Sequence, residues 1–301
     1  MLRRLASGFA GCLGGQLDYI GMGSLFFEDF KEFNSSGCID RMTSIEYMLD
    51  SEGQFDELKY RRFQMNRPFD AIEILPVSVA EAVDALSFDR HFLTWFDYDT
   101  MITRETIEET AAVIRKATTS GMLVSSTGMK IAYSYIGENR TLNLELIRDV
   151  FGDMFDGNGD AFFDALKWDN FTENIRDSVT PYYERLVAEK NIRENRNFRL
   201  YKTGRITYNQ PALFVSEIWL LVDMDEVKMN AIEEKVLRTP DAGEHFIVMP
   251  VLTGREKTII GSRLGDDPCV LAQELAIDED SIRKYIRYWD DFILADGIRF
   301  R

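Results

Sequence analysis

The stretch Leu17-Asp18-Tyr19-Ile20-Gly21-Met22-Gly23-Ser24 runs from an apolar segment directly into two glycines, and a helical pattern follows it. Such a transition from strand to glycine turn to helix opens the βαβ units of open α/β sheets. There the glycine backbone approaches a ligand closely, and the helix start offers free N–H groups. The stretch therefore predicts a first β-strand over residues 17–20 and a candidate ligand-binding loop directly after it.

Four more short apolar runs follow in the next hundred residues, and helical patterns separate them. The runs are Met42–Ile45, Ala71–Leu75, His91–Phe96 and Met122–Ser125, and the helical segments are Leu25–Phe33, Phe55–Asn66, Val79–Ala85 and Arg104–Ala117, the last with Thr103 as its N-cap. This alternation predicts an α/β fold in which five parallel strands between Leu17 and Ser125 carry helices on both faces.

The second half of the chain changes character. Residues 140–195 have a largely helical pattern, the alternation from Ile206 to Val222 predicts an antiparallel hairpin, and His245–Val248 indicates a further strand or an extended connection. The pattern is helical again from Gly254. We expect one domain over residues 1–253 with a helical insertion at about 140–195, and a C-terminal helical extension over 254–301 packed on it.

The composition is that of an ordinary globular protein, with 45% hydrophobic and 29% charged residues among 301. A net charge of -16 argues against nucleic acid or an anionic membrane as a partner. Three scattered cysteines favour a reducing, cytoplasmic compartment, and two histidines are too few for a multi-histidine metal site. The apolar stretch Leu5–Leu13 is short and broken by glycine, so we do not interpret it as an export signal, and no stretch predicts a membrane span.

The loop Gly21-Met22-Gly23-Ser24 lacks the third glycine of the dinucleotide fingerprint, because Phe26 stands there. The short Gly-x-Gly form suits S-adenosylmethionine, which has no pyrophosphate, although a tight turn without a ligand has the same sequence. Glu46 ends the second strand 23 positions after Gly23, where an acid accepts hydrogen bonds from ribose hydroxyls. A solvated glutamate is the alternative. The candidate cofactor-binding residues are Gly21, Met22, Gly23, Ser24, Glu46, Tyr47 and Asp97.

Asp97-Tyr98-Asp99 lies where the fourth predicted strand ends, which is the edge at which open α/β sheets bind ligands. Asp97 and Asp99 are the candidate catalytic residues, and Asp97 is the better candidate for a general base, since neighbouring aromatic bulk could raise its pKa. A divalent cation at Asp97, with Asp169-Asn170 as distant ligands, is possible but unsupported by any third carboxylate spaced nearby. Alternatively, the two aspartates simply begin a loop.

A helix-turn-helix spacing occurs in Leu271–Tyr285, but its second helix would begin Asp278-Glu279-Asp280. Three acids at that position would repel DNA phosphates, so we interpret the segment as structural helical packing and not as a nucleic-acid reader.

Several of these segments together resemble a bacterial family labelled "putative O-methyltransferase". The resemblance rests on Tyr19–Phe30, Met42–Glu46, Arg62–Phe69, Trp95–Asp99 and Met249–Thr253, and it extends over roughly the whole chain. It implies a Rossmann-like methyltransferase fold, S-adenosylmethionine as cofactor and an unknown methyl acceptor, in a bacterial defence or mobile-element context. By the same resemblance, Gly21 and Gly23 would line the methionine end of the cofactor, Glu46 would meet its ribose, and Asp97 would lie near the reactive methyl group.

One departure from the family pattern matters. The first-strand acid common in many methyltransferases is absent, because Tyr19 and Ile20 stand just before the glycines. The alternative to an enzyme is therefore a catalytically silent methyltransferase-like module that acts through protein partners. The sequence leaves the oligomeric state open.

Overall fold

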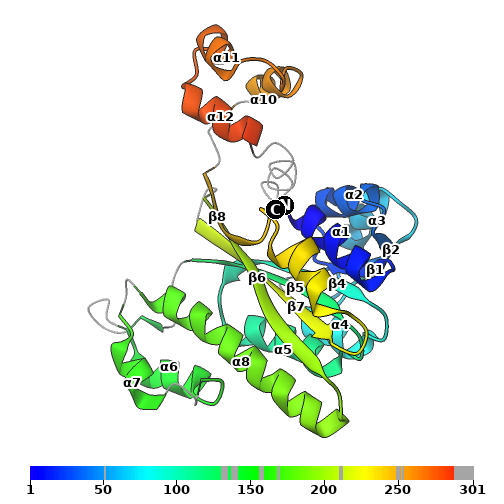
Figure 1. Ribbon diagram of the computed structural model, residues 1–301, viewed down its shortest axis with the longest axis vertical. Coiled ribbons are helices and arrows are strands. Elements are labelled where there is room, and N and C mark those ends of the chain that lie inside the picture. The colour runs from blue at the N-terminus through cyan, green and yellow to red at the C-terminus, as the bar shows by residue number, and fades with distance from the viewer. Residues whose placement is uncertain are drawn as a thin grey trace.

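The computed structural model describes residues 1–50, 52–129, 135–136, 142–155, 159–167, 170–209, 213–248, 252 and 254–287. Within them, one eight-stranded sheet has the order β3-β2-β1-β4-β5-β7-β6-β8 (Figure 1). The strands are β1 (Leu17–Gly21), β2 (Ile39–Ile45), β3 (Ile72–Leu75), β4 (Phe92–Met101), β5 (Gly121–Gly128), β6 (Phe198–Asn209), β7 (Leu213–Asp223) and β8 (Gly243–Val248).

The strand directions confirm the predicted α/β architecture. Strands β1 to β5 pair in parallel, and β6 and β7 form the antiparallel hairpin expected around Ile206–Val222. Strand β7 is also antiparallel to β5, whereas β8 pairs in parallel with β6. The fold is thus Rossmann-like, with a mostly parallel sheet and one antiparallel hairpin. Its strand order reverses between β1 and β4, and ligands of open α/β sheets bind beside such a reversal at the carboxyl ends of the strands.

Helices cover both faces of the sheet. They are α1 (Leu2–Leu13), α2 (Glu28–Ser35), α3 (Glu57–Asn66), α4 (Val79–Ala85), α5 (Arg104–Lys116), α6 (Leu144–Phe151), α7 (Gly159–Ala165), α8 (Phe171–Glu194), α9 (Met229–Ile232), the π-helix η4 (Glu233–Leu237), α10 (Gly254–Gly261), α11 (Pro268–Leu275) and α12 (Glu279–Arg287). Helices α2 to α5 occupy the four predicted crossovers, and the Thr103 side chain accepts from Thr106 N as the expected cap of α5. None of the described helices is long and apolar enough to cross a membrane.

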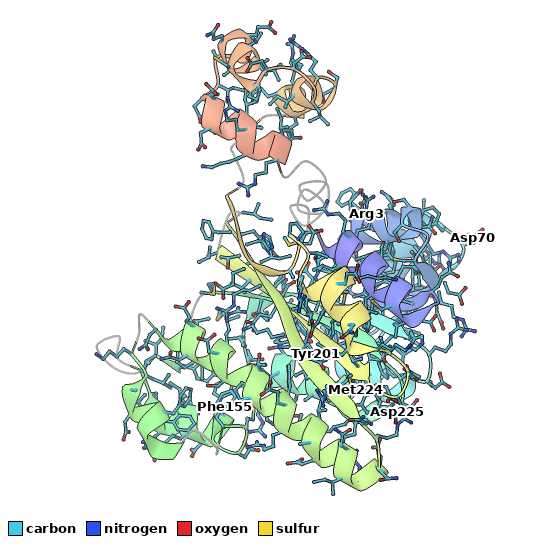
Figure 2. The ribbon with its side chains drawn as sticks, viewed as in Figure 1. Arg3, Asp70, Phe155, Tyr201, Met224 and Asp225 are labelled. Carbon is cyan, nitrogen blue, oxygen red and sulfur yellow. The ribbon has the colours of Figure 1, made fainter. Side chains whose placement is uncertain are left out.

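Two apolar cores result, one on each face of the sheet. One lies under α1, α2 and η4 and contains Leu5, Phe9, Phe30, Leu93, Trp95, Met122 and Val236. The other lies under α5 and α8 and contains Phe96, Ile107, Ile114, Leu123, Ile175 and Val179. Phe155, labelled in Figure 2, extends the second core to α6 and α7, because its ring packs 5.8 Å from those of both Phe151 and Phe162.

Helix α1 was not predicted, since glycines interrupt its short apolar run. Its buried residues Leu2, Leu5, Ala6 and Phe9 recur with helical spacing and face the sheet. A Cβ atom added at Gly8 would lie 2.5 Å from the Lys235 carbonyl oxygen of η4, so Gly8 allows the two helices to approach closely. Arg3, labelled in Figure 2, pairs with Glu32 of α2 at 2.7 Å. Tertiary packing, rather than local propensity, therefore holds this helix in place.

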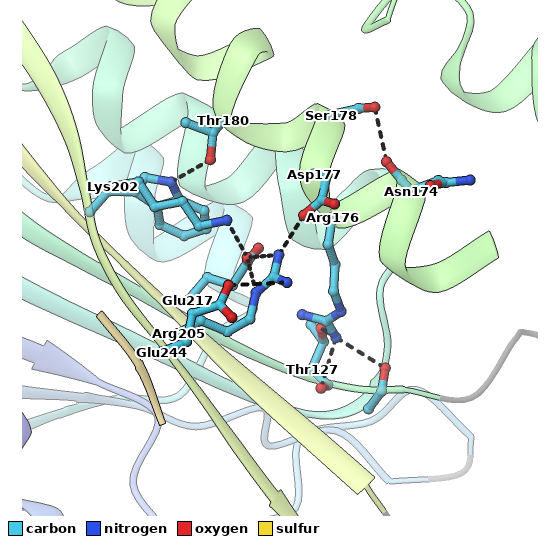
Figure 3. Close-up of polar contacts among 12 residues, drawn as sticks. Thr127, Asn174, Arg176, Asp177, Ser178, Thr180, Lys202, Arg205, Glu217 and Glu244 are labelled. Carbon is cyan, nitrogen blue, oxygen red and sulfur yellow. Dashed lines mark hydrogen bonds and ion pairs between the residues drawn. The ribbon is translucent and has the colours of Figure 1, made fainter. Parts of the chain in front are cut away.

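A buried polar network joins α8 to the sheet (Figure 3). Arg176, only 2% exposed, donates to the Thr127 carbonyl at 3.0 Å and to the Gly128 carbonyl at 3.2 Å, where β5 ends. Burial lowers the pKa of Arg176 to about 10. Nearby, the buried Glu217 accepts two hydrogen bonds from Arg205, at 3.0 and 2.9 Å. These contacts connect α8, β5, β6 and β7 through charges that the sequence analysis did not single out.

Helices α10 to α12 follow β8 and lie at one end of the molecule (Figure 1). Helices α11 and α12 pack together across Ala276, a residue in the left-handed region with φ 52°. Their buried residues Leu271, Ala272, Ile282 and Tyr285 have the spacing noted in the sequence. The predicted helical character of this segment is confirmed for residues 254–287.

Candidate functional site

The glycine loop leaves the sheet at the point where the strand order reverses. Gly21 is the last residue of β1, and it pairs with Ser44 of β2 on one side and Trp95 of β4 on the other. The Met22 N–H continues the pairing by donating to the Trp95 carbonyl at 3.3 Å. The loop thus begins between the carboxyl ends of β2 and β4, the edge at which a ligand is expected.

Gly23 brings this loop onto two polar side chains, Ser44 of β2 and Glu46 directly after this strand. Its N–H donates to Ser44 Oγ at 3.2 Å, and Ser44 Oγ donates to Glu46 Oε1 at 2.8 Å. A Cβ atom at Gly23 would overlap Ser44 Oγ and lie 2.5 Å from Glu46 Oε1, so only glycine fits here. Ser44 is fully buried and Glu46 is 7% exposed. The structure therefore fixes the Glu46 carboxylate directly beside the glycine loop, two strands from Asp97.

Gly21 makes room for a different partner. A Cβ atom there would lie 2.5 Å from Tyr19 Oη, because the fully buried Tyr19 ring lies along β1 over this glycine. Tyr19 Oη donates a hydrogen bond to the Asp29 carboxylate in the first turn of α2. The absent side chain of Gly21 thus serves the packing of Tyr19, a role that the Gly-x-Gly pattern alone does not reveal.

The rest of the loop is a tight turn into α2. Ser24, 7% exposed, uses its Oγ to accept from Phe26 N at 3.3 Å, and its carbonyl accepts from Phe27 N at 3.1 Å. Phe27 itself has φ 50°, a left-handed conformation that is unfavourable for a bulky residue. It is retained because the Phe27 ring is fully buried against those of Phe30 and Phe63, at 5.5 and 6.0 Å. Packing therefore compensates for a strained backbone beside the candidate site.

The remaining candidate cofactor residues are less enclosed. Tyr47, directly after Glu46, is 58% exposed, and its carbonyl accepts from Lys59 Nζ at 2.7 Å. Met22 is partly buried against the core that contains Phe96. Tyr47 therefore offers an accessible aromatic ring next to the Glu46 carboxylate.

The two candidate catalytic aspartates differ in their burial. Asp97 is 7% exposed and pairs with Ser126 of β5, whereas Asp99 is exposed, beyond a break in the register of β4 and β5. Strand alternation puts Asp97 on the Trp95 face of the sheet. There the Trp95 indole N–H donates to Ser126 Oγ at 2.9 Å, and Ser126 Oγ lies 2.7 Å from Ser216 Oγ. A buried acid and two buried hydroxyls thus follow one another across β4, β5 and β7.

Phe96 and Tyr98 pack on the opposite face, so of the three aromatic neighbours only Trp95 shares the face of Asp97. Tyr98 Oη donates to the Glu109 carboxylate of α5. Burial, followed by the charge of Glu109, raises the pKa of Tyr98 well above its usual value. Burial also raises the pKa of Glu109. These two groups connect β4 to α5 on the face of the sheet opposite to Asp97.

The described residues contain no group of three or more histidines, cysteines or acids that could hold a metal ion. Of the distant metal ligands considered from sequence, Asp169 lies outside the described residues. Asn170 uses its Oδ1 to accept from Lys167 N at 2.7 Å in the turn before α8. A divalent cation at Asp97 therefore gains no support from the geometry.

Three carboxylates occupy this edge of the sheet: Glu46 after β2, Asp29 above β1, and Asp97 in β4. Because β2, β1 and β4 are consecutive in the sheet, these acids surround the exit of the glycine loop. The arrangement suits a ligand that has hydroxyl donors at one end and positive charge at the other, and it supplies a buried carboxylate able to accept a proton.

Comparison with known proteins gives a family match along almost the whole chain. The model of a family described as "Putative O-methyltransferase" matches residues 3–291. No curated protein matches.

Among solved structures, an O-methyltransferase from Bacillus cereus in complex with SAH shares 11% identity, with 74% of this chain and 80% of that chain covered and a TM-score of 0.33. An N-methyltransferase from Bradyrhizobium japonicum WM9 in complex with S-adenosyl-l-homocysteine shares 10% identity, with 73% of this chain and 84% of that chain covered and a TM-score of 0.34. A spermidine synthase from Thermotoga maritima shares 11% identity, with 78% of this chain and 64% of that chain covered and a TM-score of 0.35.

Proposed function

Because the chain belongs to the family described as "Putative O-methyltransferase", we propose that it binds S-adenosylmethionine and transfers the methyl group to a hydroxyl oxygen of an acceptor. We assign cofactor binding to Gly21, Met22, Gly23, Ser24, Glu46 and Tyr47 and catalysis to Asp97, with Asp99 in an accessory role. The free thiols of Cys12, Cys38 and Cys269 support activity in the reducing cytoplasm.

The observation that carries the proposal is the contact of Gly23 with Ser44 and Glu46. A glycine without room for a Cβ atom beside a nearly buried carboxylate is a costly arrangement for a simple turn. Ser44 Oγ donates a hydrogen bond to Glu46, and a carboxylate, with two oxygens, accepts several hydrogen bonds, such as those of ribose hydroxyls. Tyr47 is accessible next to it for stacking against an adenine ring.

Bound at this edge, S-adenosylmethionine supplies an electrophilic methyl group on a positively charged sulfur. The protein's contribution is to hold the acceptor oxygen in line and to exclude water. As the new carbon–oxygen bond forms and the carbon–sulfur bond breaks, the acceptor hydroxyl loses its proton, and we assign the Asp97 carboxylate as the group that takes it. Trp95 and Phe33, with ring centroids 6.3 Å apart, form an apolar wall on that face of the sheet.

We propose further that residues 1–253 contain the whole catalytic part and that 254–301 are an extension packed on it. The competing hypothesis is a silent module that uses the same fold to bind protein partners. Such a module would have no need of the Glu46 carboxylate, so replacing this residue separates the two hypotheses.

The test is isothermal titration of the full chain with S-adenosylmethionine and with S-adenosylhomocysteine. We expect binding by the wild type, and a loss of roughly 10- to 100-fold in affinity for Glu46→Gln, because charge-assisted hydrogen bonds to ribose are lost. Glu73→Gln, an exposed acid on the adjacent strand β3, is the matched control and should bind normally. No heat and no thermal shift with either ligand at millimolar concentration would refute the proposal in favour of the silent module.

A further inference from the structure

The Tyr19–Asp29 pair is a buried feature that the assignments above leave without a role. Tyr19 is fully buried between Phe30 and Phe33, with ring centroids 4.8 and 4.7 Å away. Its hydroxyl reaches past Gly21 and donates to the carboxylate of Asp29. Asp29 is itself only partly exposed. A carboxylate from α2 is thereby held over the last residue of β1.

The backbone around the pair is built to place this acid. The left-handed Phe27 turns the chain sharply, so that α2 begins directly above the glycine loop. Gly21 has no side chain, which leaves room for the Tyr19 hydroxyl that donates to Asp29. A residue with a strained backbone and a glycine that leaves space for a neighbour both reduce the stability of the fold, and an ordinary helix N-terminus needs neither.

A negative charge in the first turn of a helix is favourable by itself, because it interacts with the helix dipole. Glu28 already occupies that turn, and it pairs with Lys31 on the surface at 2.8 Å. Asp29 differs from Glu28 because it points at a buried phenol next to the loop. Since an ionised carboxylate accepts several hydrogen bonds at once, the bond from Tyr19 orients Asp29 without preventing it from binding a ligand.

We propose that Asp29, oriented by Tyr19, binds the α-ammonium group at the methionine end of the cofactor. The inference rests on the proposed function, and it divides the ligand between two acids: Glu46 beside β2 takes the ribose, and Asp29 above β1 takes the ammonium. Asp97 in β4 then remains for the acceptor. Asp29 binds the cofactor directly, and Tyr19 is a positioning residue that acts through it.

Isothermal titration calorimetry with three ligands that differ in their amino-acid portion tests this assignment, and it requires no measurement of methyl transfer. S-adenosylmethionine and S-adenosylhomocysteine carry the ammonium group, whereas 5′-methylthioadenosine has the same adenosine and thioether without the amino-acid portion. We expect Asp29→Asn to weaken the first two by an equal factor of roughly 10 to 100, the loss of one charge-assisted hydrogen bond, and to leave methylthioadenosine unchanged. Tyr19→Phe, which keeps the ring packing, should show the same selectivity with a smaller factor.

Glu28→Gln removes the same charge from the same helical turn and should bind all three ligands like the wild type. Equal weakening of all three ligands by Asp29→Asn would mean a purely structural role and would overturn the inference, as would unchanged binding of all three. A larger loss for S-adenosylmethionine than for S-adenosylhomocysteine would assign Asp29 to the sulfonium instead, which also overturns it. If the wild type bound none of the three, the proposed function itself would fail, and this inference with it.

Discussion

Replacing Gly23 with alanine tests the contact on which the site assignment depends. The new Cβ atom would overlap Ser44 Oγ and stand 2.5 Å from Glu46 Oε1, so one of these buried groups must move. The backbone of Gly23 is not in the left-handed region, and alanine can therefore adopt it without strain. Any destabilisation measured for Gly23→Ala would consequently report the side-chain overlap and not the backbone.

The expected cost follows from three contributions. Overpacking a buried site costs about 1–3 kcal/mol. Loss of the hydrogen bond from Gly23 N to Ser44 Oγ adds about 1 kcal/mol, whereas the smaller conformational freedom of alanine in the unfolded chain returns about 0.4–1 kcal/mol. We expect Gly23→Ala to lower the free energy of unfolding by about 1–3.5 kcal/mol and to weaken S-adenosylhomocysteine binding, because Glu46 is displaced.

A double-mutant cycle with Ser44→Ala localises the effect. Ser44→Ala alone leaves the Gly23 N–H without its acceptor, at a cost of about 1–3 kcal/mol. In the double variant the overlapping Oγ is absent, so the added Cβ meets mainly Glu46. The double variant should therefore be more stable than the sum of the single effects predicts, by at least about 1 kcal/mol.

Urea denaturation of the four proteins measures these differences, and Gly15→Ala is the control, since a Cβ atom there would meet nothing within 4 Å. Gly15→Ala should leave both stability and ligand affinity close to the wild type. Additive effects within about 0.5 kcal/mol, or a Gly23→Ala variant as stable as the control, would refute the close contact between the loop and β2.

Three further expectations concern chemistry, pH and packing. Asp97→Asn should retain cofactor affinity while turnover, once an acceptor is found, falls at least ~100-fold; transfer at the parental rate would remove Asp97 from the mechanism. Because burial raises the folded-state pKa of Glu109, its stabilising contribution is complete below its unfolded pKa and is lost as pH rises through the folded pKa. Glu109→Gln, which still accepts from Tyr98, should thus gain stability relative to wild type as pH increases from about 4.5 to 7 in denaturation curves, and a pH-independent difference would contradict this. Gly8→Ala should lower the free energy of unfolding by about 1–3 kcal/mol, because the new Cβ atom pushes α1 away from η4. Gly11→Ala in the same helix is the control: only the Lys235 Nζ atom lies near its Cβ position, at 3.9 Å, so the protein should gain about 0.5–1 kcal/mol in stability. Equal shifts in the melting temperatures of the two variants would refute the close packing of α1 on η4.

The sheet was readable from the sequence because its central strands are short apolar runs bounded by turn residues. The run His91–Phe96 and the run Met122–Ser125 became β4 and β5, and the alternation around Ile206–Val222 became the hairpin. Such patterns are local, so a strand can be predicted from them without knowing which strands it pairs with. Helix α1 was not predicted because its stability comes from contacts with η4, which lies more than 200 residues away in the sequence. A local sequence pattern does not contain such contacts.

The site was only partly predictable for the same reason. The proximity of Gly23 and Glu46 follows from the βαβ unit, in which the ends of neighbouring parallel strands meet at one edge. The reason for Gly21 is the Tyr19 ring, and the partner of that ring is Asp29, ten residues further on. A sequence pattern assigns a glycine to a turn, but it does not show which side chain occupies the space that the glycine leaves. The cofactor-binding assignments, including that of Tyr47, and the catalytic assignments of Asp97 and Asp99 stay predictions.

The long-range contacts of α1 also order the events of protein synthesis. Arg4 pairs with Asp241 and Cys12 donates to the Ala231 carbonyl, so these contacts of α1 form only after some 230 residues have been added. At about 5–20 residues per second the ribosome needs roughly 10–50 s for that length. During this interval the side of α1 that later contacts η4 stays uncovered. Completion of this part of the core therefore waits until η4 has been synthesised.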